Sequence, residues 1–516
     1  MAIKIAGTEV ISDSRGLNNI ASVDATTVAS LSAAGVGGGG TADFVASGAI
    51  SNGEVVALQS DGTVTLCTAT GSAGPNSVGT NVTYLQSTFD SNSNKVIVSY
   101  KDNSLDRLKV TVGTISGGSI SFGTPVVVEN ANIFDPVITF DSNSNKVVVA
   151  FSSTNGGQGR SYVGTVSGTS ISFGSMSVFN AGSAVELDLV FDTTSNKVVV
   201  VFRNGTNNTG QYCVGTVSGT SITWGSVGEF TGSTAEQSKI VYNSTENKLV
   251  VFYRSTSNYG QSRVGTLSGS TISWGSTVRY GSGAAYYHRA TSIGGTSKVA
   301  VLYRETSSGD PISIQVGTIS GTSISSYGSK VVVNDASGSQ TQWYDQDISY
   351  DENSQRLLIA YKSTVSKPYY PCMQLASISG TFISLEGTIY DIETQAVSTN
   401  SGVQYLNLAY DSNNENYILS YTDNNGTSSP ATSNTFSIGN GSNFIGIASE
   451  SISNAATGEV TILGGINESL TGLTVSADYY VNTNVAGGVS TSTGSNIKIG
   501  RALSATKLLI TQGNTQ

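Results

Sequence analysis

Short runs of alternating apolar and polar residues recur along this chain, separated by clusters of Gly, Asn, Asp and Ser. Four stretches have nearly the same sequence: FDSNSNKVIVSY, FDSNSNKVVVAF, FDTTSNKVVVVF and YNSTENKLVVFY. Their lysines, Lys95, Lys146, Lys197 and Lys248, are spaced at a constant 51 residues. Alternation with a period of two and many β-branched residues are typical of strands. A repeat of roughly 40–50 residues filled with such strands predicts a propeller-type array.

Each repeat is predicted to contain four strands, which in the second copy cover residues 135–140, 146–151, 160–167 and 170–179. Asp-Ser-Asn-Ser-Asn between the first two strands suits a tight turn, because Asn and Asp bond their own backbone and tolerate positive φ. A second recurring stretch, VGTVSGTSISFG at residues 163–174, places Ser-Gly-Thr-Ser in the second hairpin turn. No window has a sustained helical period. The chain is therefore predicted to be all-β.

The repeats continue, less regularly, to about residue 439, which predicts a seven-bladed propeller over residues 76–439. The last copy has no clear fourth strand, and segment 75–83 could supply it. The alternative is an open solenoid, although the sequence shows no capping repeats for one. Residues 1–40 are predicted to form a docking or oligomerisation segment ending in a Gly-rich joint. Residues 41–75 and 440–516 are predicted to combine into one small β-module into which the propeller is inserted.

Composition and charge disfavour several classes of function. The chain has 516 residues, only 12% of them charged, and a formal net charge of −10. Scattered acidic residues disfavour nucleic-acid binding, which depends on dense Lys and Arg contacts to phosphate. No apolar run approaches the roughly 20 residues that span a bilayer, so no membrane insertion is expected. The first residues, MAIKIAGTEVISDSR, show no signal-peptide pattern, so folding in a reducing cytoplasm is expected.

No cofactor or metal site is expected. Cys67, Cys213 and Cys372 are widely spaced and are predicted to be buried free thiols. Asp-Ser-Asn-Ser-Asn resembles a short calcium loop, but it lacks the terminal bidentate Glu of an EF-hand, so turn chemistry explains it better. His288 is the only histidine, which leaves no partner for a His-His metal site, and it is expected to line a crossover loop.

A candidate binding site follows from the loops after the second strand of each repeat. These loops diverge between copies, whereas the hairpin turns of the opposite face are nearly constant, so function is predicted on the divergent face. In five of seven copies that strand ends in an aromatic residue and then a cation, namely Lys101, Arg203, Arg254, Arg304 and Lys362. Tyr259, Tyr369 and Tyr370 lie in the same loops.

Guanidinium groups bind carboxylates in two-pronged geometry and aromatic faces stack on sugar rings, so these eight residues predict a site for an acidic glycan. The alternative is that the cations cap strand ends and pair with Asp102, Glu305 or Asp310. An enzyme is not expected. A sialidase-like hydrolase needs paired carboxylates, no spacing singles out such a pair, and the Asp-box sequences of sialidase blades are absent.

Several stretches resemble segments of bacteriophage virion proteins. Residues 3–23 (IKIAGTEVISDSRGLNNIASV) look like the N-terminal segments of tail-fibre and other virion proteins of marine and cyanobacterial phages. Residues 470–481 and 499–510 are similar to a small β-module common in phage tail and capsid-decoration proteins, and residues 163–174 resemble repeats of such proteins. The resemblance implies a virion protein that assembles in the host cytoplasm and docks to other virion proteins through residues 1–40. Fibre segments of this kind often trimerise, so a homo-oligomer is expected.

These observations predict a tail fibre or appendage that displays a propeller for host-surface recognition, with a surface polysaccharide as ligand. One alternative is a capsid or tail decoration protein with a purely structural role. A second alternative is a glycan depolymerase. Recognition predicts ligand binding on the divergent face, decoration predicts tight particle binding without a ligand, and a depolymerase would release reducing ends from host polysaccharide.

Overall fold

A computed structural model describes residues 3–5, 8–11, 40–59, 61–68, 71–116, 119–153, 157–305, 311–334, 346–352, 354–362, 371–392, 403–413, 416–423, 429–439, 444–482, 486–491 and 497–511. The chain divides into two compact units, Met1–Gly71 with Ser437–Gln516, and Ser72–Phe436. All regular secondary structure in these ranges is β-strand, so the all-β prediction is confirmed. Across the same ranges, no helix has the length and apolar character needed to span a membrane.

The larger unit repeats one antiparallel sheet. In the second copy, β12 (Ile133–Asp141), β13 (Lys146–Ser153), β14 (Gly159–Ser167) and β15 (Ser170–Phe173) pair in chain order. A short strand β16 (Ser177–Asn180) then returns to pair with β14. The predicted fourth strand, 170–179, is therefore two strands. The break falls at Gly174, where the chain passes directly against Thr220 of the next copy.

Three further copies have the same order. Their strands are β7 (Val82–Asp90), β8 (Lys95–Asp102), β9 (Arg107–Ser116), β10 (Ser119–Phe122) and β11 (Val126–Glu129); β17 (Ala184–Asp192), β18 (Lys197–Asn204), β19 (Thr209–Ser218), β20 (Ser221–Trp224) and β21 (Gly228–Thr234); and β31 (Gln346–Asp351), β32 (Arg356–Lys362), β33 (Pro371–Ser379) and β34 (Phe382–Asp391).

Two neighbouring copies are joined by one long strand. The first consists of β22 (Glu236–Asn243), β23 (Lys248–Arg254), β24 (Tyr259–Ser268) and β25 (Thr271–Trp274), and the second continues with β27 (Lys298–Glu305), β28 (Ile312–Ser320), β29 (Ser323–Tyr327) and β30 (Val331–Asn334). Strand β26 (Val278–Ile293) pairs with β24 at its start and with β27 at its end, so the two copies form one nine-stranded sheet.

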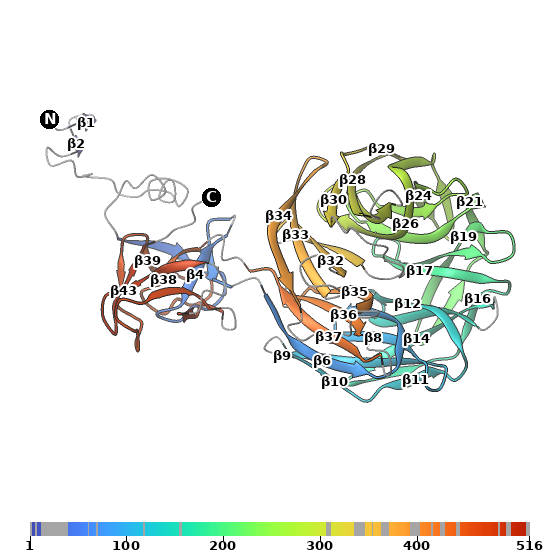
Figure 1. The fold of residues 1–516 in the computed structure, drawn as a ribbon, viewed down its shortest axis with the longest axis horizontal. Coiled ribbons are helices and arrows are strands. Elements are labelled where there is room, and N and C mark those ends of the chain that lie inside the picture. Colours follow the sequence, from blue (N-terminus) through green and yellow to red (C-terminus); the bar gives the residue numbers. More distant parts are fainter. Residues whose placement is uncertain are drawn as a thin grey trace. The chain divides into compact units, whose positions relative to one another are not determined.

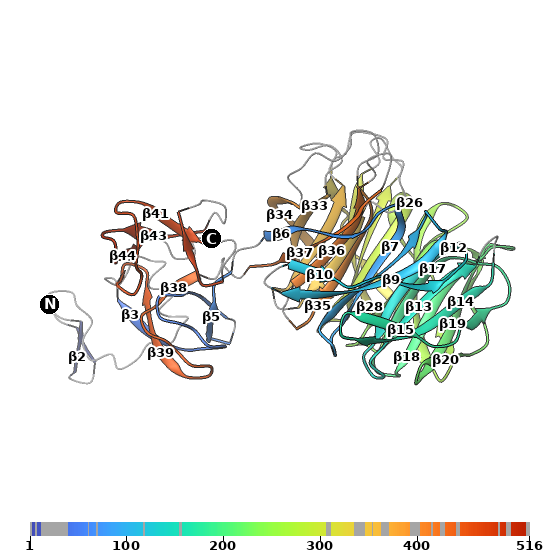
Figure 2. The same ribbon diagram turned by 90° about the horizontal axis from the view of Figure 1, so that it is seen from below.

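The last copy borrows a strand from the beginning of the unit. Strands β35 (Val403–Asp411), β36 (Asn416–Asp423) and β37 (Ala431–Ser437) are completed by β6 (Gly71–Gly79), which overlaps the segment that the sequence suggested for this role. Strand β35 also contacts β7, and Asn407 Oδ1 accepts a hydrogen bond of 2.7 Å from Ser87 N. The first and last copies are therefore in contact. In Figure 1 the sheets follow one another in chain order, with β12, β17 and β35 toward the middle of the unit, and Figure 2 shows the same sheets after a turn of 90°.

The apolar cores lie between adjacent sheets. Val148 and Val163 of the second copy, for example, pack with Leu189, Val198 and Phe202 of the third. The second strand of each copy is covered on both faces, which explains why it reads as a nearly continuous apolar run instead of alternating. The sequence KVVVVF of β18 has only its first residue partly exposed.

The Asp-Ser-Asn-Ser-Asn turn is held by its own aspartate. Asp141 Oδ1 accepts hydrogen bonds of 3.0 Å from the backbone N–H groups of Asn143 and Ser144, and Asn145 has a φ of 53°. Asp90 makes the same two bonds in the first copy. The repeated lysines are scaffold residues too, since Lys95 Nζ donates to Thr114 Oγ1 at 2.8 Å.

Replacing Asp141 with alanine is expected to lower the free energy of unfolding of the larger unit by about 1–3 kcal/mol, because two N–H groups lose a charged acceptor. Asp141 is 2% exposed, so water replaces it poorly. Urea denaturation of the full chain measures the change. Ser142→Ala, at an exposed position of the same turn, is the control. Equal losses for both variants would show that the aspartate does not hold the turn.

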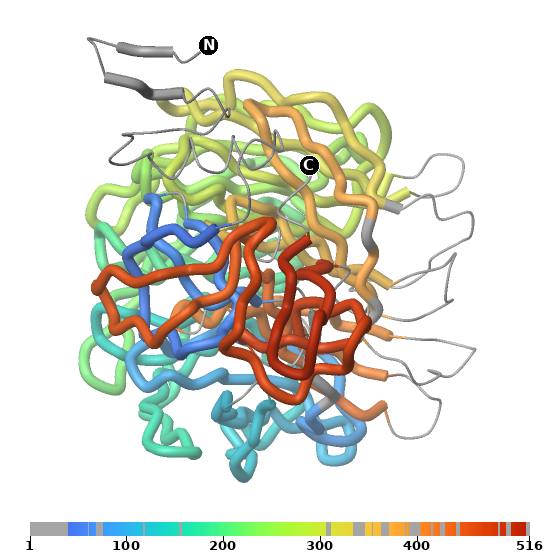
Figure 3. Tube along the Cα trace, turned by 90° about the vertical axis from the view of Figure 1, so that its left-hand side faces the viewer, coloured from blue at the N-terminus to red at the C-terminus, as the bar shows by residue number. Residues whose placement is uncertain are grey.

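The smaller unit combines both ends of the chain. One sheet has the order β3 (Thr41–Val45), β39 (Thr457–Ile462), β38 (Phe444–Ala448), β4 (Val55–Leu58), β5 (Val64–Leu66). The other has the order β40 (Ile466–Asn467), β44 (Leu508–Ile510), β43 (Lys498–Ala502), β41 (Asp478–Val481), β42 (Val489–Ser490). Figure 3 shows early (blue) and late (red) segments of the chain side by side in this unit, where β39 pairs with β3 and β38 pairs with β4. Strands β1 (Ile3–Ile5) and β2 (Thr8–Ile11) form a separate hairpin.

Candidate functional site

The first strands of the repeats share an irregularity near their beginning. Strands β7 and β8 lose register between Thr83 and Gln86, and Tyr84 there has a φ of 51°. The same combination of register shift and positive φ recurs at Asp135 (48°), Glu186 (55°), Gln237 (53°), Tyr287 (56°) and Tyr405 (53°). Positive φ is uncommon for residues other than glycine. A bulge re-aims the side chain that it carries, so six strands of the described chain present a side chain in one common way.

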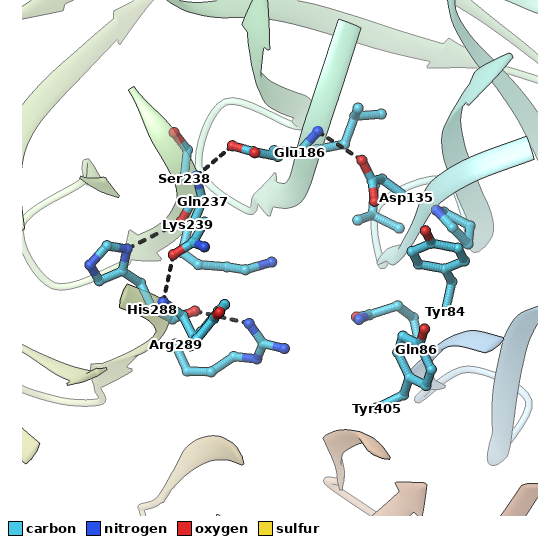
Figure 4. A pocket seen from close by; sticks show the side chains of 14 residues that line it. Tyr84, Gln86, Asp135, Glu186, Gln237, Ser238, Lys239, His288, Arg289 and Tyr405 are labelled. Carbon is cyan, nitrogen blue, oxygen red and sulfur yellow. Dashed lines mark hydrogen bonds between the residues drawn. The ribbon is translucent and has the colours of Figure 1, made fainter. Parts of the chain in front are cut away.

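All six side chains line a single cavity. Its other lining residues are Gln86, Pro136, Val137, Leu187, Ser238, Lys239, His288 and Arg289. In Figure 4, Tyr84, Gln86 and Tyr405 lie on one side and Lys239, His288 and Arg289 on the other, with Asp135 and Glu186 along the edge between them. The cavity volume is about 50 Å³. That exceeds the roughly 10–15 Å³ that one water needs.

Side chains of the cavity bond the backbone of the next strand around it. Asp135 Oδ2 accepts from Glu186 N at 2.9 Å, Glu186 Oε2 accepts from Gln237 N at 2.6 Å, and Gln237 Oε1 accepts from Tyr287 N at 2.6 Å. Figure 4 draws these bonds as a chain along one side of the cavity. The bulges thus orient polar side chains that are also held in place, which is the preorganisation that a binding site requires.

A second tier of polar residues lies near the bulged residues and includes Asp188, two positions after Glu186 in β17, and Asp347 in β31. Asp188 Oδ2 accepts from Ile240 N at 2.8 Å, and Asp347 Oδ2 accepts from Leu408 N at 2.7 Å. Lys239 Nζ lies 3.1 Å from Asp188 Oδ1, and Arg289 Nε lies 3.7 Å from Asp347 Oδ1. The two cations at the cavity are therefore balanced by carboxylates.

Burial raises the pKa of Asp135 above its ordinary value; the Glu186 N–H opposes this shift and the Glu186 charge adds to it. Burial also raises the pKa of Asp347, against the opposing effect of Arg289. Both carboxyl groups therefore hold a proton to a higher pH than an exposed aspartate does.

His288 does not line a crossover loop, as the sequence suggested, but belongs to β26. It is fully buried, its Nδ1 lies 3.3 Å from Gln237 O, and its ring meets Tyr280 edge-on with centroids 5.8 Å apart. Burial lowers the pKa of His288 to about 3. The imidazole is therefore neutral under ordinary conditions and acts as a packing residue.

The cations predicted from the sequence lie beside the cavity, without lining it. Lys101, Arg203, Arg254 and Arg304 are the cross-strand partners of Thr83, Val185, Glu236 and Tyr286, each of which directly precedes a bulged residue. Lys362 is buried at the end of β32. Tyr259, 36% exposed in β24, has the Arg279 guanidinium 3.3 Å above its ring, while Tyr369 and Tyr370 lie outside the described residues.

Ion pairs are formed by Lys101, Arg203 and Arg254. Lys101 Nζ lies 3.1 Å from Asp106, Arg203 lies 3.0 Å from Glu186, and Arg254 pairs with Glu236. The alternative of strand-end pairing thus holds for them, but with different carboxylates from those expected. Asp102 and Glu305 pair instead with Lys109 and Lys330, and Asp310 lies outside the described residues. A ligand-binding role for the cations stays a prediction.

The residues that line the cavity were not singled out from the sequence, although a signal is present. Each bulged residue lies six positions before the residue that opens the constant turn, as Tyr84 does before Asp90 and Asp135 before Asp141. At this offset the copies read Tyr, Asp, Glu, Gln, Tyr and Tyr. Variation at one fixed position of a constant repeat would have indicated the site.

Replacing Asp135 with asparagine is expected to flatten the dependence of stability on pH. Because its folded pKa lies above its unfolded value near 3.8, the folded state binds the extra proton, and stability falls as pH rises through that window. Asparagine removes this loss and still accepts the Glu186 N–H bond. Thermal melts from pH 4 to 7 test this, with Asp106→Asn, an exposed site, as the charge control. A parallel pH curve for the Asp135 variant would contradict the raised pKa.

No protein-family model matches this chain and no curated protein matches it either. Among solved structures, AofleA from Arthrobotrys oligospora is 11% identical, covers 66% of this chain and 93% of its own, and has a TM-score of 0.40. An Aleuria aurantia lectin mutant in complex with Fucα1-6GlcNAc is 12% identical, covers 61% and 99%, and has a TM-score of 0.38. The intramolecular trans-sialidase from Ruminococcus gnavus is 13% identical, covers 69% and 94%, and has a TM-score of 0.42.

These comparisons correct one expectation from the sequence. The sequence predicted that the chain is not an enzyme. This prediction is corrected, because the trans-sialidase among its structural neighbours is an enzyme, so an enzymatic activity is not excluded. The neighbours thus include lectins and a sialidase-like protein. At these identities and TM-scores they identify no family for the chain.

Proposed function

We propose that the larger unit is a closed seven-bladed propeller that binds a carbohydrate at the cavity formed by its first strands. One observation carries the proposal: three tyrosines, two carboxyl groups, two amides and two cations from six of the described first strands converge on the same cavity. Each tyrosine (Tyr84, Tyr287 and Tyr405) is half-buried, so each residue is partly exposed to solvent.

Closure of the ring is supported by contacts between consecutive first strands. Each of β7, β12, β17, β22, β26 and β31 contacts the first strand of the following copy, and β35 contacts β7. The bond from Ser87 N to Asn407 Oδ1 joins the end of this series to its beginning. Strand β6 adds the outer strand of the last sheet, so that both ends of the repeat region are fixed in one blade.

The chemistry of the cavity suits sugar hydroxyls. Aromatic faces pack against the C–H faces of a sugar ring, while carboxylates, amides and cations exchange hydrogen bonds with its hydroxyl groups. The cations are balanced, since Lys239, Arg289 and Arg203 each face a carboxylate. We therefore propose a hydroxyl-rich ligand whose acidic groups, if it has any, are secondary to recognition.

A glycan array probed with the labelled full-length chain tests this function. Binding to a restricted set of glycans is expected, and Tyr405→Ala should weaken it by about tenfold, the usual scale for loss of an aromatic anchor. Phe382→Ala is the matched control, because this ring is 69% exposed on an outer strand. The array should include α-fucosides, with which two structural neighbours were solved. Absence of binding, or equal loss in both variants, would contradict the proposal.

We further propose that this binding serves host attachment, with the chain as a tail fibre or appendage of a virion. Support comes from the resemblance of residues 3–23, 163–174, 470–481 and 499–510 to phage virion proteins. Immunogold labelling of purified particles with an antibody against residues 80–439 tests the setting. Label on the tail or appendages is the expected result. Label over the capsid would favour the decoration role, and absence of label would contradict a virion protein.

A further inference from the structure

Aromatic rings gather at one side of the cavity around Tyr84. The ring centroids of Tyr84 and Tyr405 are 5.5 Å apart, and those of Tyr84 and Phe134 are 6.4 Å apart. Lys101 Nζ lies 5.1 Å from the centroid of Phe134. We call Tyr84, Tyr405 and Phe134 the Tyr84 platform. All three rings are half-buried, so the platform exposes part of its aromatic surface.

A second aromatic group belongs to β26. The rings of Tyr286 and Tyr287 are 6.0 Å apart at an interplanar angle of 45°. The Arg254 guanidinium lies 4.2 Å above the Tyr286 ring, and that of Arg304 lies 5.5 Å from the Tyr287 ring. We call these two tyrosines the Tyr287 platform. The arginines hold the rings by cation–π contact and border the surface that both half-buried rings expose.

The bulge explains why two consecutive tyrosines lie together. Successive side chains of a regular strand point to opposite faces of the sheet. Between Tyr286 and Arg289 the register of β26 against β27 shifts, and Tyr287 has a φ of 56°. The shift re-aims Tyr287 toward Tyr286, and the pair forms one continuous surface that a regular strand could not provide.

A polar arc separates the two platforms. Between β7, which carries Tyr84, and β26 lie β12, β17 and β22, in that order of contact. Their bulged residues are Asp135, Glu186 and Gln237, the chain of hydrogen-bonding side chains described above. In Figure 4, Tyr84 and Tyr405 lie across the cavity from His288 and Arg289, the residues that follow Tyr287.

We propose that the two platforms are separate sugar subsites and that the arc between them binds hydroxyl groups of the same ligand. The ligand is then an oligosaccharide of at least two rings that crosses the cavity, instead of one terminal sugar. This inference rests on the proposed carbohydrate function and adds the size of the ligand. The two platforms belong to different strands, with β12, β17 and β22 between them along the polar arc and β31 between them on the other side, so we assign one sugar ring to each.

The test uses an immobilised series of one sugar, from monosaccharide to hexasaccharide, chosen from the glycans that wild-type chain binds on the array. Wild-type affinity is expected to rise by about tenfold or more from the monosaccharide to the longer members, since a second aromatic contact is added. Tyr84→Ala and Tyr286→Ala should each abolish this rise. The affinity for the monosaccharide should fall in at most one of these two variants, namely the one that lacks a ring of the platform to which the single sugar binds.

Tyr286→Phe and Phe382→Ala complete the set. Tyr286→Phe retains the ring and should retain the rise, and this outcome separates loss of a contact from loss of folding in Tyr286→Ala. Phe382→Ala should behave as wild type. Equal wild-type affinity for all lengths, or an unchanged rise in either alanine variant, would overturn the two-subsite inference alone. No wild-type binding to any member of the array would instead overturn the carbohydrate function, and this inference with it.

Discussion

Replacing Gly174 with valine is expected to lower the free energy of unfolding of the larger unit by about 3 kcal/mol, the upper end of the usual range for overpacking. A Cβ atom at Gly174 would overlap the backbone oxygen of Thr220 in the hairpin turn of the next sheet. Backbone cannot rotate away as a side chain can, so the two sheets would have to separate. The same contact recurs at Gly123 with Thr169, Gly275 with Thr322 and Gly328 with Thr381.

Urea denaturation of the full chain, followed by tyrosine and tryptophan fluorescence, measures this loss. Gly387→Val is the matched control, because Gly387 lies in the outer strand β34, is exposed, and has no neighbouring atom within 4 Å of an added Cβ. It should leave stability within about 0.5 kcal/mol of wild type, as surface changes usually do. If Gly174→Val were equally harmless, contact between sheets at this glycine would not hold the unit together.

Replacing Glu186 with alanine is expected to weaken carbohydrate binding by at least tenfold. Glu186 occupies the middle of the polar arc, where it accepts from Gln237 N at 2.6 Å and lies 3.0 Å from the Arg203 guanidinium. Its loss leaves Arg203 without this carboxylate and removes the acceptor of the Gln237 N–H. A hydrogen bond from a ligand hydroxyl to a carboxylate contributes about 1.5–3 kcal/mol. Glu186 and Arg203 are 18% and 21% exposed, so we expect the lower end.

Glu129→Ala is the matched control for this variant. Glu129 is 17% exposed, lies 4.0 Å from Arg160 and accepts from Tyr162 Oη at 3.1 Å, but it belongs to the outer strand β11. Titration calorimetry should therefore show wild-type affinity for Glu129→Ala. The double variant of Glu186 and Arg203 should bind about as weakly as Glu186→Ala alone, since the two residues act as a pair. Equal affinity of wild type and Glu186→Ala would contradict a binding role for the polar arc.

The repeats and their turns could be predicted because the responsible forces are local. The turn at Asp141 depends on bonds within four residues, and the apolar second strand follows from burial on both faces. Function was predicted on the divergent face, where Arg203 and Arg254 pair across the ladder with Val185 and Glu236, each one position before a bulged residue. Whether ligand binds there stays a prediction.

The cavity could not be derived from local rules, because its geometry depends on neighbouring sheets. No turn-forming sequence near Glu186 predicts its positive φ. This conformation occurs together with a hydrogen bond from Gln237 N of the next sheet to the Glu186 side chain. His288 was expected to line a crossover loop, yet it lies in β26, where the bulge at Tyr287 directs it into the core beside Tyr280. The break at Gly174 likewise reflects contact with Thr220 of another copy.

A crystal structure of the full chain with the glycan that binds most strongly on the array tests the central claim most directly. Sugar rings are expected against Tyr84 and Tyr405 or against Tyr286 and Tyr287, with hydroxyl groups hydrogen-bonded to Asp135, Glu186 or Gln237. Glycan bound between the outer strands or on the smaller unit, with the cavity filled only by water, would contradict it.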